Sequence, residues 1–215
     1  ILVIWGFASW SGHPAEAPGP TCTNSSEPIK IGFIGPLTGD TANIGQNAKA
    51  AVEIAVTEVN ATGGINGRQL EVIYEDGQCT GTEAANAANK LINVDKVPVI
   101  IGGACSGESS AFTGLAEQTK TVVLSYCSSA PALTQAGDYF FRDYPSDSYQ
   151  GSFAADYAFQ TLEKNKVAVL YVKSDWGVGI HDVFISKFKT LGGRIVADES
   201  YEQTARDLRT QLTKI

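Results

Sequence analysis

Residues 99–110 combine an apolar segment with two glycines and then Ser106, a pattern with clear chemical potential. Glycines let an incoming group approach the backbone closely. If a helix begins at Ser106, its unpaired amides and the hydroxyl could bind an anion such as a carboxylate or a phosphate. The alternative interpretation is that Ser106 only caps its own helix, with Glu108 and Glu117 on the exposed face.

The same stretch places Cys105 in a Gly-x-Cys-x-Gly pattern, the spacing of a nucleophile elbow with cysteine in place of serine. Such an enzyme needs a base nearby, and the sequence holds only His13 and His181. Cys79 offers a different partner, because it follows another predicted strand and parallel strands end at the same edge of a sheet. In an exported protein, a disulfide between Cys79 and Cys105 is favoured over a free thiolate.

A second polar loop follows the predicted fourth strand, and it contains Cys127 and Ser129 among several small residues. Ligands of α/β proteins bind at the carboxyl ends of the strands. Small hydroxyl groups with free carbonyls and amides suit a zwitterion, which needs acceptors for its ammonium and donors for its carboxylate. The alternative is a capped turn before a short helix at 131–135. Two such loops, 103–107 and 126–130, at one edge favour a binding site.

A third candidate loop opens a predicted helix with Asp175, Trp176 and a Gly-x-Gly pattern. This pattern lacks the third glycine of a dinucleotide fingerprint, and the sequence contains no P-loop. Trp176 either faces a cleft or covers the start of the helix. No cluster of His, Cys and carboxylate residues has the spacing of a metal site. The sequence therefore predicts neither a cofactor nor a metal ion.

Short β-branched runs alternate with longer helical periods along most of the chain. The runs predict strands at 29–34, 70–74, 97–101, 121–125, 167–171 and 194–198, with a shorter candidate at 139–142. Helical spacing predicts helices at 45–60, 82–94, 106–119, 149–162, 175–191 and from 207 to 215. Most strands are apolar on both faces, as a covered parallel sheet requires. The alternation predicts right-handed crossovers and a doubly wound α/β fold.

One polar segment, residues 125–148, interrupts this alternation before it restarts. The simplest account is two doubly wound parallel-sheet lobes joined by a connector. We expect the first lobe at 28–146 and the first part of the second lobe at 147–215. The absence of Met and an amphipathic pattern that runs to the last residue indicate a fragment, in which the second lobe is incomplete.

Composition narrows the class of protein further. The chain has 215 residues and a formal net charge of −7, from 16 Lys and Arg against 23 Asp and Glu. Its 43% hydrophobic and 18% charged residues exclude a disordered chain. A sequence pI near 4.8 argues against nucleic acid as a partner, because nucleic-acid-binding proteins need a basic face.

Residues 1–27 indicate a truncated signal peptide and a linker. The apolar run at residues 1–10 is too short to span a bilayer, and Ala15-Glu16-Ala17 resembles a cleavage site. We therefore expect export to the periplasm or another extracytoplasmic space. Cys22 is a candidate for lipidation and membrane association, although the residues before it match a lipobox poorly.

In the order of its motifs, the chain resembles the type I periplasmic binding proteins, above all the branched-chain amino acid (Leu/Ile/Val) substrate-binding proteins of ABC transporters. The resemblance runs from residue 28 to the end, and a Gly-Pro-x-[ST]-Gly start with a Gly-Gly-Ile-x-Gly turn makes it specific. The matching segments are 31–39, 50–60 with 63–68, 74–76, Cys79, 105–106, 125–134 and 171–179.

The resemblance implies an exported, non-enzymatic protein that captures a small amino-acid-like ligand between two lobes and delivers it to an ABC-transporter permease. It also implies that Cys79 and Cys105 form the disulfide of the first lobe. A second hypothesis is the ligand-sensing extracellular domain of a receptor with the same fold. The third is the α/β hydrolase with Cys105 as nucleophile.

Individual roles follow from the same resemblance. Ser106 matches the serine that holds the ligand carboxylate, and Cys127 falls where the family uses a backbone carbonyl toward the ammonium. Ser129 matches a threonine or serine that touches both charged ends of the ligand. Ile44 stands where several members place an aromatic wall. Trp176 matches a tyrosine that closes over the ligand from the second lobe.

Overall fold

The computed structural model describes residues 27–215. The predicted signal peptide, its cleavage site, His13 and the candidate lipidation site Cys22 lie outside the described residues. Within residues 27–215, none of the helices combines the length and the apolar character that a bilayer crossing requires.

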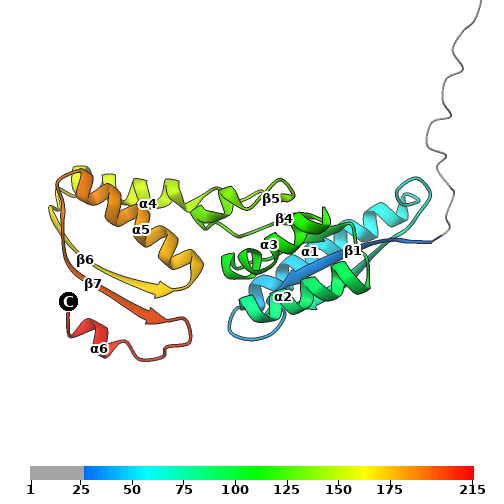
Figure 1. Cartoon of the computed structure of the whole chain (residues 1–215), viewed down its shortest axis with the longest axis horizontal. Helices are drawn as coiled ribbons and strands as arrows, with labels where there is room; N and C mark the ends of the chain where they lie inside the picture. The colour runs from blue at the N-terminus through cyan, green and yellow to red at the C-terminus, as the bar shows by residue number, and fades with distance from the viewer. Residues whose placement is uncertain (1–26) are drawn as a thin grey trace, which may run out of the picture.

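The first part of the chain forms a five-stranded parallel sheet in the order β2-β1-β3-β4-β5 (Figure 1). Its strands are β1 (Ile29–Gly35), β2 (Leu70–Asp76), β3 (Val99–Ile101), β4 (Val122–Ser125) and β5 (Phe140–Arg142). The chain moves outward in one direction from β1 to β2 and in the other direction from β3 onward. In open α/β sheets, such a change of direction between neighbouring strands marks where ligands bind.

Helices cover both faces of this sheet. On one face lie α2 (Gly81–Asn89) and α3 (Ser106–Thr119), which bury Ile100, Phe112 and Val123 in the main hydrophobic core. On the other face lies α1 (Ala42–Ala61), whose Lys49 ammonium sits 4.9 Å from the ring centre of Tyr74. This double coverage explains why the strands are apolar on both sides.

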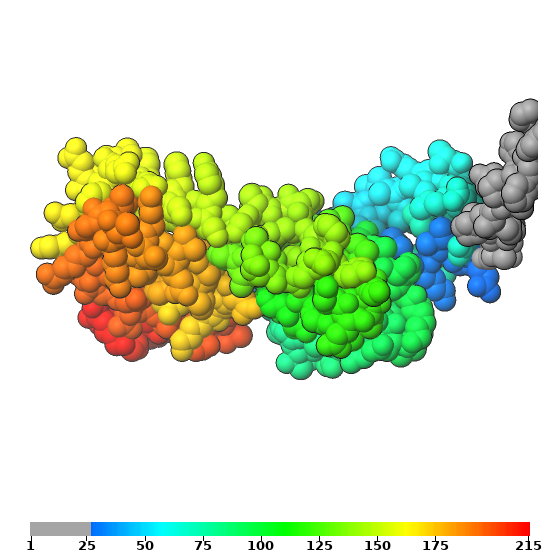
Figure 2. Space-filling model, turned by 45° about the horizontal axis from the view of Figure 1, so that its top comes forward, coloured from blue at the N-terminus to red at the C-terminus, as the bar shows by residue number. Residues whose placement is uncertain are grey.

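The second part of the chain forms a two-stranded parallel sheet of β6 (Lys166–Lys173) and β7 (Arg194–Glu202). Two helices, α4 (Asp147–Asp156) and α5 (Asp175–Thr190), pack against each other beside it (Figure 1). In the space-filling view, this yellow-to-red part and the green-to-blue part form two masses (Figure 2). The α/β class and the parallel sheets confirm the prediction, whereas the lobe boundaries at 146 and 147 stay a prediction.

Most predicted elements are present, with local differences at their ends. The helices predicted to end at 94 and 162 finish in π-helical turns, η1 (Lys90–Val94) and η3 (Tyr157–Thr161). The predicted connector holds the 3-10 turn η2 (Pro131–Gln135) and supplies β5 to the first sheet. The last helix, α6 (Arg209–Leu212), is shorter than predicted at both ends; at its start, the Asp207 carboxylate accepts from the Arg209 amide in a local turn.

Several contacts join the two parts of the chain. The first turns of α5 pack on η2, where a Cβ added to Gly179 would lie 2.6 Å from Cδ of Pro131. On the loop that follows β7, Arg206 forms an ion pair with Asp40. The neighbouring Gln203 amide donates to Sγ of Cys79 at 3.4 Å. Side chains of the second part therefore contact the loops that follow β1 and β2.

Candidate functional site

The two polar loops predicted to share one sheet edge are in direct contact. The Ser106 hydroxyl oxygen, at the start of α3, accepts hydrogen bonds from the backbone amides of Ser129 at 3.3 Å and Ala130 at 3.1 Å. The residue that caps α3 is Cys105, so the alternative in which Ser106 caps its own helix is wrong. Parallel strands β3 and β4 bring the loops together because both strands end at this edge.

A buried cluster of serines fixes the backbone beneath this edge. The carbonyl oxygen of Gly103 accepts from the hydroxyls of Ser125 at 2.7 Å and Ser128 at 3.0 Å. The Ser109 hydroxyl lies 2.8 Å from that of Ser128 and also contacts Gly103. All three serines are buried. The loop after β4 is therefore held by side-chain hydrogen bonds to the loop after β3, which pre-organises its free backbone groups.

Glu108 lies inside the protein, and the expectation that it faces solvent is wrong. Its side chain is fully buried and accepts from the amides of Ala104 at 2.9 Å, Cys105 at 3.0 Å and Cys79 at 3.0 Å. Burial raises the pKa of this carboxyl group, although the three backbone hydrogen bonds oppose the shift. Helical spacing alone could not identify this position, since its partners come from loops outside the helix.

The glycine pair after β3 is required by the packing of the chain itself. A Cβ atom at Gly102, whose φ is 144°, would lie 2.1 Å from the carbonyl oxygen of Ile34. A Cβ at Gly103 would lie 2.6 Å from Cβ of Glu108. The close approach that we expected from a ligand is therefore made by neighbouring protein atoms.

The predicted disulfide between Cys79 and Cys105 is confirmed, with the two Cα atoms 5.3 Å apart. A cysteine in a disulfide has no thiolate, so the hypothesis of Cys105 as a hydrolase nucleophile is wrong. His181, its candidate base, is engaged elsewhere: its two ring nitrogens lie 2.8 Å from Asp182 and 2.9 Å from Asp198.

The two loops offer hydrogen-bond donors at Ser106, at the start of α3, and an acceptor at Cys127, in the loop after β4. Ser106 accepts two hydrogen bonds, which uses both lone pairs and leaves its proton to donate. The first amides of α3 add further donors, because the first turn of a helix leaves them unpaired. On the other side, the carbonyl of Cys127 accepts no hydrogen bond from residues 27–215. Ser106 and Ser129 are each only 3% exposed.

A buried acidic residue, Asp147, contacts the loop after β4. Asp147, in the first turn of α4, is buried and accepts from the Ser129 hydroxyl at 2.6 Å. Burial, and then the charges of Asp143 and Asp147, raise the pKa of the free Cys127 thiol. Sequence reasoning missed Asp147, because an acidic residue in a first helical turn normally faces solvent.

The two predicted apolar contacts lie at the starts of other helices. Ile44 belongs to the first turn of α1 and is 40% exposed, and Trp176 belongs to the first turn of α5 and is 45% exposed. Helix α5 packs against α3 and η2, so Trp176 projects from an element next to the site. The proposed roles of both residues, as a wall and as a lid, stay predictions.

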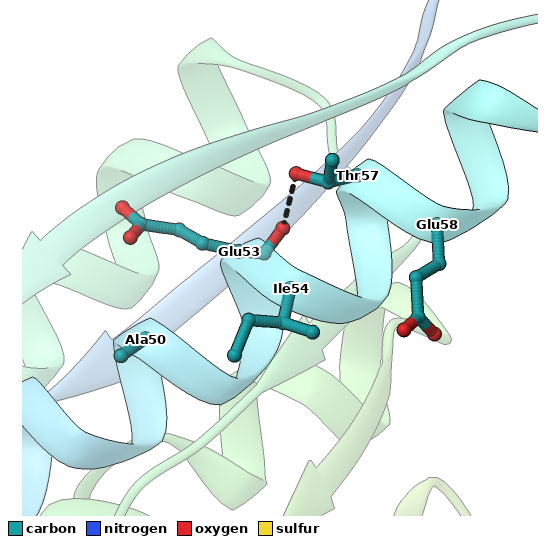
Figure 3. A pocket seen from close by; sticks show the side chains of 5 residues that line it. All are labelled: Ala50, Glu53, Ile54, Thr57 and Glu58. Carbon is teal, nitrogen blue, oxygen red and sulfur yellow. Dashed lines mark hydrogen bonds between the residues drawn. The ribbon is translucent and has the colours of Figure 1, made fainter.

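Two hollows lie elsewhere on the surface. The larger, about 400 Å³, lies near the amino ends of β3 and β4, on the side away from Ser106. The other, about 350 Å³, is lined only by α1 side chains: Ala50, Glu53, Ile54, Thr57 and Glu58 (Figure 3). Polar groups from different elements do not converge there, which distinguishes it from the edge at Ser106. Among residues 27–215, no group of His, Cys, Asp and Glu is arranged to hold a metal ion.

Comparisons with known proteins agree with this architecture. Residues 28–215 match the family described as "Periplasmic binding protein". The leucine-, isoleucine-, valine-, threonine- and alanine-binding protein of Pseudomonas aeruginosa is 28% identical over 215 residues, which are 100% of this chain and 54% of that protein. The chain thus spans about half the length of the curated relatives it matches.

Two solved structures are similar over most of the chain. The branched-chain amino acid transporter substrate binding protein LivJ from Streptococcus pneumoniae, in complex with isoleucine, has a TM-score of 0.76 and 34% identity, covering 87% of this chain and 53% of its own. A solute binding protein of an ABC transporter from Rhodopseudomonas palustris, in complex with 3,4-dihydroxy benzoic acid, has a TM-score of 0.76 and 25% identity. That match covers 88% of this chain and 51% of the other.

Proposed function

The chain belongs to the periplasmic binding protein family, and from this premise we propose that it is a solute-binding protein for a small amino acid. The ligand would bind at the edge formed by Ser106 and the loop after β4. In this proposal, the protein acts outside the cytoplasm, binds without catalysis and delivers its ligand to an ABC-transporter permease.

The observation that carries the proposal is the separation of donors and acceptors at this edge. The Ser106 hydroxyl already accepts from two backbone amides, so its proton remains for an acceptor such as a carboxylate. The Cys127 carbonyl, without a donor among the described residues, suits an ammonium. An amino acid carries both groups on one carbon, which matches two complementary groups on adjoining loops.

The relatives support the amino acid over other acids. The Pseudomonas aeruginosa relative is named for five amino acids, and the Streptococcus pneumoniae structure holds isoleucine. The Rhodopseudomonas palustris structure holds 3,4-dihydroxy benzoic acid, which has a carboxylate but no ammonium. An aromatic acid would use Ser106 and leave the acceptors at Cys127 without a partner, at a cost in affinity.

Binding also requires motion in this proposal. Ser106 and Ser129 are only 3% exposed, so a solute must displace groups that cover them. The first turns of α5, packed on η2 and α3, are the element whose withdrawal would open the edge. Hinge motion of two units around a ligand is a known way to couple binding to a partner.

Isothermal titration of the full-length protein with leucine, isoleucine, valine and 3,4-dihydroxy benzoic acid tests the proposal. We expect saturable binding of at least one amino acid. Ser106→Ala should weaken it by about 1–3 kcal/mol, since a hydrogen bond to a charged group is lost. Ser110→Ala, an exposed serine one turn further along α3, is the matched control and should bind normally. Binding of the aromatic acid alone, or unchanged affinity in Ser106→Ala, would contradict the proposal.

A further inference from the structure

We propose that Asp147 is a positioning residue that makes Ser129 an obligatory hydrogen-bond acceptor and thereby selects ligands that carry an ammonium group. The inference rests on the proposed function and adds a residue and a selection rule to it. It depends on the partners of one hydroxyl group at the junction between the loop after β4 and helix α4.

The Ser129 hydroxyl has a single proton, which it donates to the Asp147 carboxylate. Its oxygen lies 2.6 Å from Oδ2 of Asp147. A carboxylate can only accept, so Ser129 must be the donor in this bond. The two lone pairs of the Ser129 oxygen remain for a ligand, and they can bind only a group that donates. An ammonium satisfies this condition, whereas a carboxylate or a bare methylene does not.

Among the described residues, the Asp147 side chain neither caps α4 nor forms an ion pair. Ser146 caps α4 through its own hydroxyl, which accepts from the Ser148 amide at 3.3 Å. The ion pairs of residues 27–215 do not include Asp147. Burial of a carboxylate at 2% exposure is costly unless hydrogen bonds compensate it. The bond from Ser129 provides that compensation.

Asp147 also holds the loop from a second point. Its backbone amide donates to the Ser129 carbonyl at 2.9 Å, so the two residues are joined by two hydrogen bonds in opposite directions. Its charge is also felt at Cys127, where it contributes to the raised thiol pKa after burial and Asp143. The carboxylate therefore contacts Ser129, the first of the two acceptors assigned to the ammonium.

The two site serines consequently have opposite polarity. Ser106 has its lone pairs occupied by amides and can only donate, whereas Ser129 has its proton occupied by Asp147 and can only accept. A ligand is then bound in a single orientation, with its carboxylate at Ser106 and its ammonium at Ser129. Removing the Asp147 side chain would free the Ser129 hydroxyl to rotate and donate, so the site would lose part of its preference for the ammonium and keep only the part that comes from the Cys127 carbonyl.

The test compares leucine with 4-methylpentanoic acid, which is leucine without its amino group, by titration calorimetry on the full-length protein. The unaltered protein should prefer leucine by at least about tenfold, the value of one hydrogen bond to a charged group. In Asp147→Ala, leucine affinity should fall by about tenfold while the affinity for 4-methylpentanoic acid changes less than about twofold. Asp147→Asn keeps an acceptor oxygen and should retain most of the preference.

Ser106→Ala is the control for a general loss of binding, because both compounds carry the carboxylate and should weaken equally. An equal loss of both affinities in Asp147→Ala would overturn the inference, as would a protein that binds the two compounds equally well. A full-length protein that binds no amino acid would instead contradict the proposed function itself.

A stability measurement without ligand tests the contact between Ser129 and Asp147 even in variants that bind ligand too weakly to titrate. The urea midpoints of Asp147→Ala, Ser129→Ala and the double variant form a double-mutant cycle. The proposed bond predicts that the double variant is more stable than the sum of the single effects implies. Strictly additive effects would overturn the assigned contact.

Discussion

The two parts of the molecule differ sharply in how much they bury. The first part packs a continuous core between its five-stranded sheet and helices α2 and α3, including Leu91, Ile100 and Phe112. In the second part, the fully buried apolar side chains among the described residues are Ala155 and Phe188. The buried serines of the candidate site all belong to the first part or its connector. The proposed site therefore lies in the part of the molecule that has the larger buried core.

The contrast explains why one region can fix hydroxyl orientations and the other cannot. Each site serine of the first part has partners on a neighbouring loop that is itself held by strands β3 and β4. Trp176 and Val178, in the first turns of α5, are exposed instead. We infer that the first part sets ligand polarity and that the second part contributes a movable covering surface.

The largest losses of stability are expected when a buried phenylalanine is truncated in the core of either part. Phe112→Ala and Phe188→Ala should each cost about 3–5 kcal/mol, the usual range for a buried phenylalanine. Hydrogen exchange should show loss of protection at β3 and β4 in Phe112→Ala and at β6 and β7 in Phe188→Ala. If Phe188→Ala exposed β3 as strongly as β6, the two cores would unfold as one cooperative unit.

Removing the disulfide should destabilise the first part by a slightly smaller amount. Cys79 and Cys105 are separated by 26 residues, and chain entropy assigns a bridge over such a loop about 3–4 kcal/mol. Urea unfolding of the double Cys→Ser variant measures the effect, and a reductant should reproduce it in the unaltered protein. Cys127→Ser, which replaces a free thiol, is the control. An unchanged midpoint in the double variant would show that the bridge does not constrain the unfolded chain.

Glu108→Gln should cost about 1.5–3 kcal/mol, because an amide presents one acceptor oxygen to the three backbone amides that Glu108 binds. The same variant should also change how folding stability depends on pH. Since burial raises the pKa of Glu108, the folded state holds its proton to higher pH than the unfolded state. Stability from this group is therefore present at low pH and falls as pH rises from the ordinary glutamate pKa through the raised one.

Denaturant midpoints measured across this pH range test the assignment. Glu108→Gln should remove that part of the pH dependence, whereas Glu53→Gln on the exposed surface of α1 should leave it intact. An identical pH profile in Glu108→Gln would mean that Glu108 titrates as it does in the unfolded chain.

The smallest effect is expected at the exposed ion pair that joins the two parts. Arg206 and Asp40 are 78% and 68% exposed, so Arg206→Ala should change stability by no more than about 0.5 kcal/mol. Urea unfolding checks this value, with Arg209→Ala as a control that leaves the pair intact. A loss well above 1 kcal/mol would mean that this contact, and not separate cores, holds the two parts together.

Sequence patterns could predict which loops meet at this edge of the sheet, but not the hydrogen bonds that join them. The loops with Ser106 and Ser129 were predictable because each follows a buried run, and parallel strands bring such loops to one edge. Glu108 and Asp147 were not, because a polar residue in a first helical turn usually faces solvent, and their partners lie on loops distant in sequence. The later start of α6 was not predicted either, since a local hydrogen bond from the Arg209 amide to the Asp207 carboxylate precedes the helix.

The most direct test of the central claim is a crystal structure of the full-length protein with leucine. We expect the leucine carboxylate within hydrogen-bond distance of the Ser106 hydroxyl, with the ammonium on the Ser129 oxygen and the Cys127 carbonyl. Asp147 should still accept the Ser129 proton. Leucine bound in the reverse orientation, or at a surface other than this edge, would show that Ser106 and Ser129 do not set the orientation of the ligand.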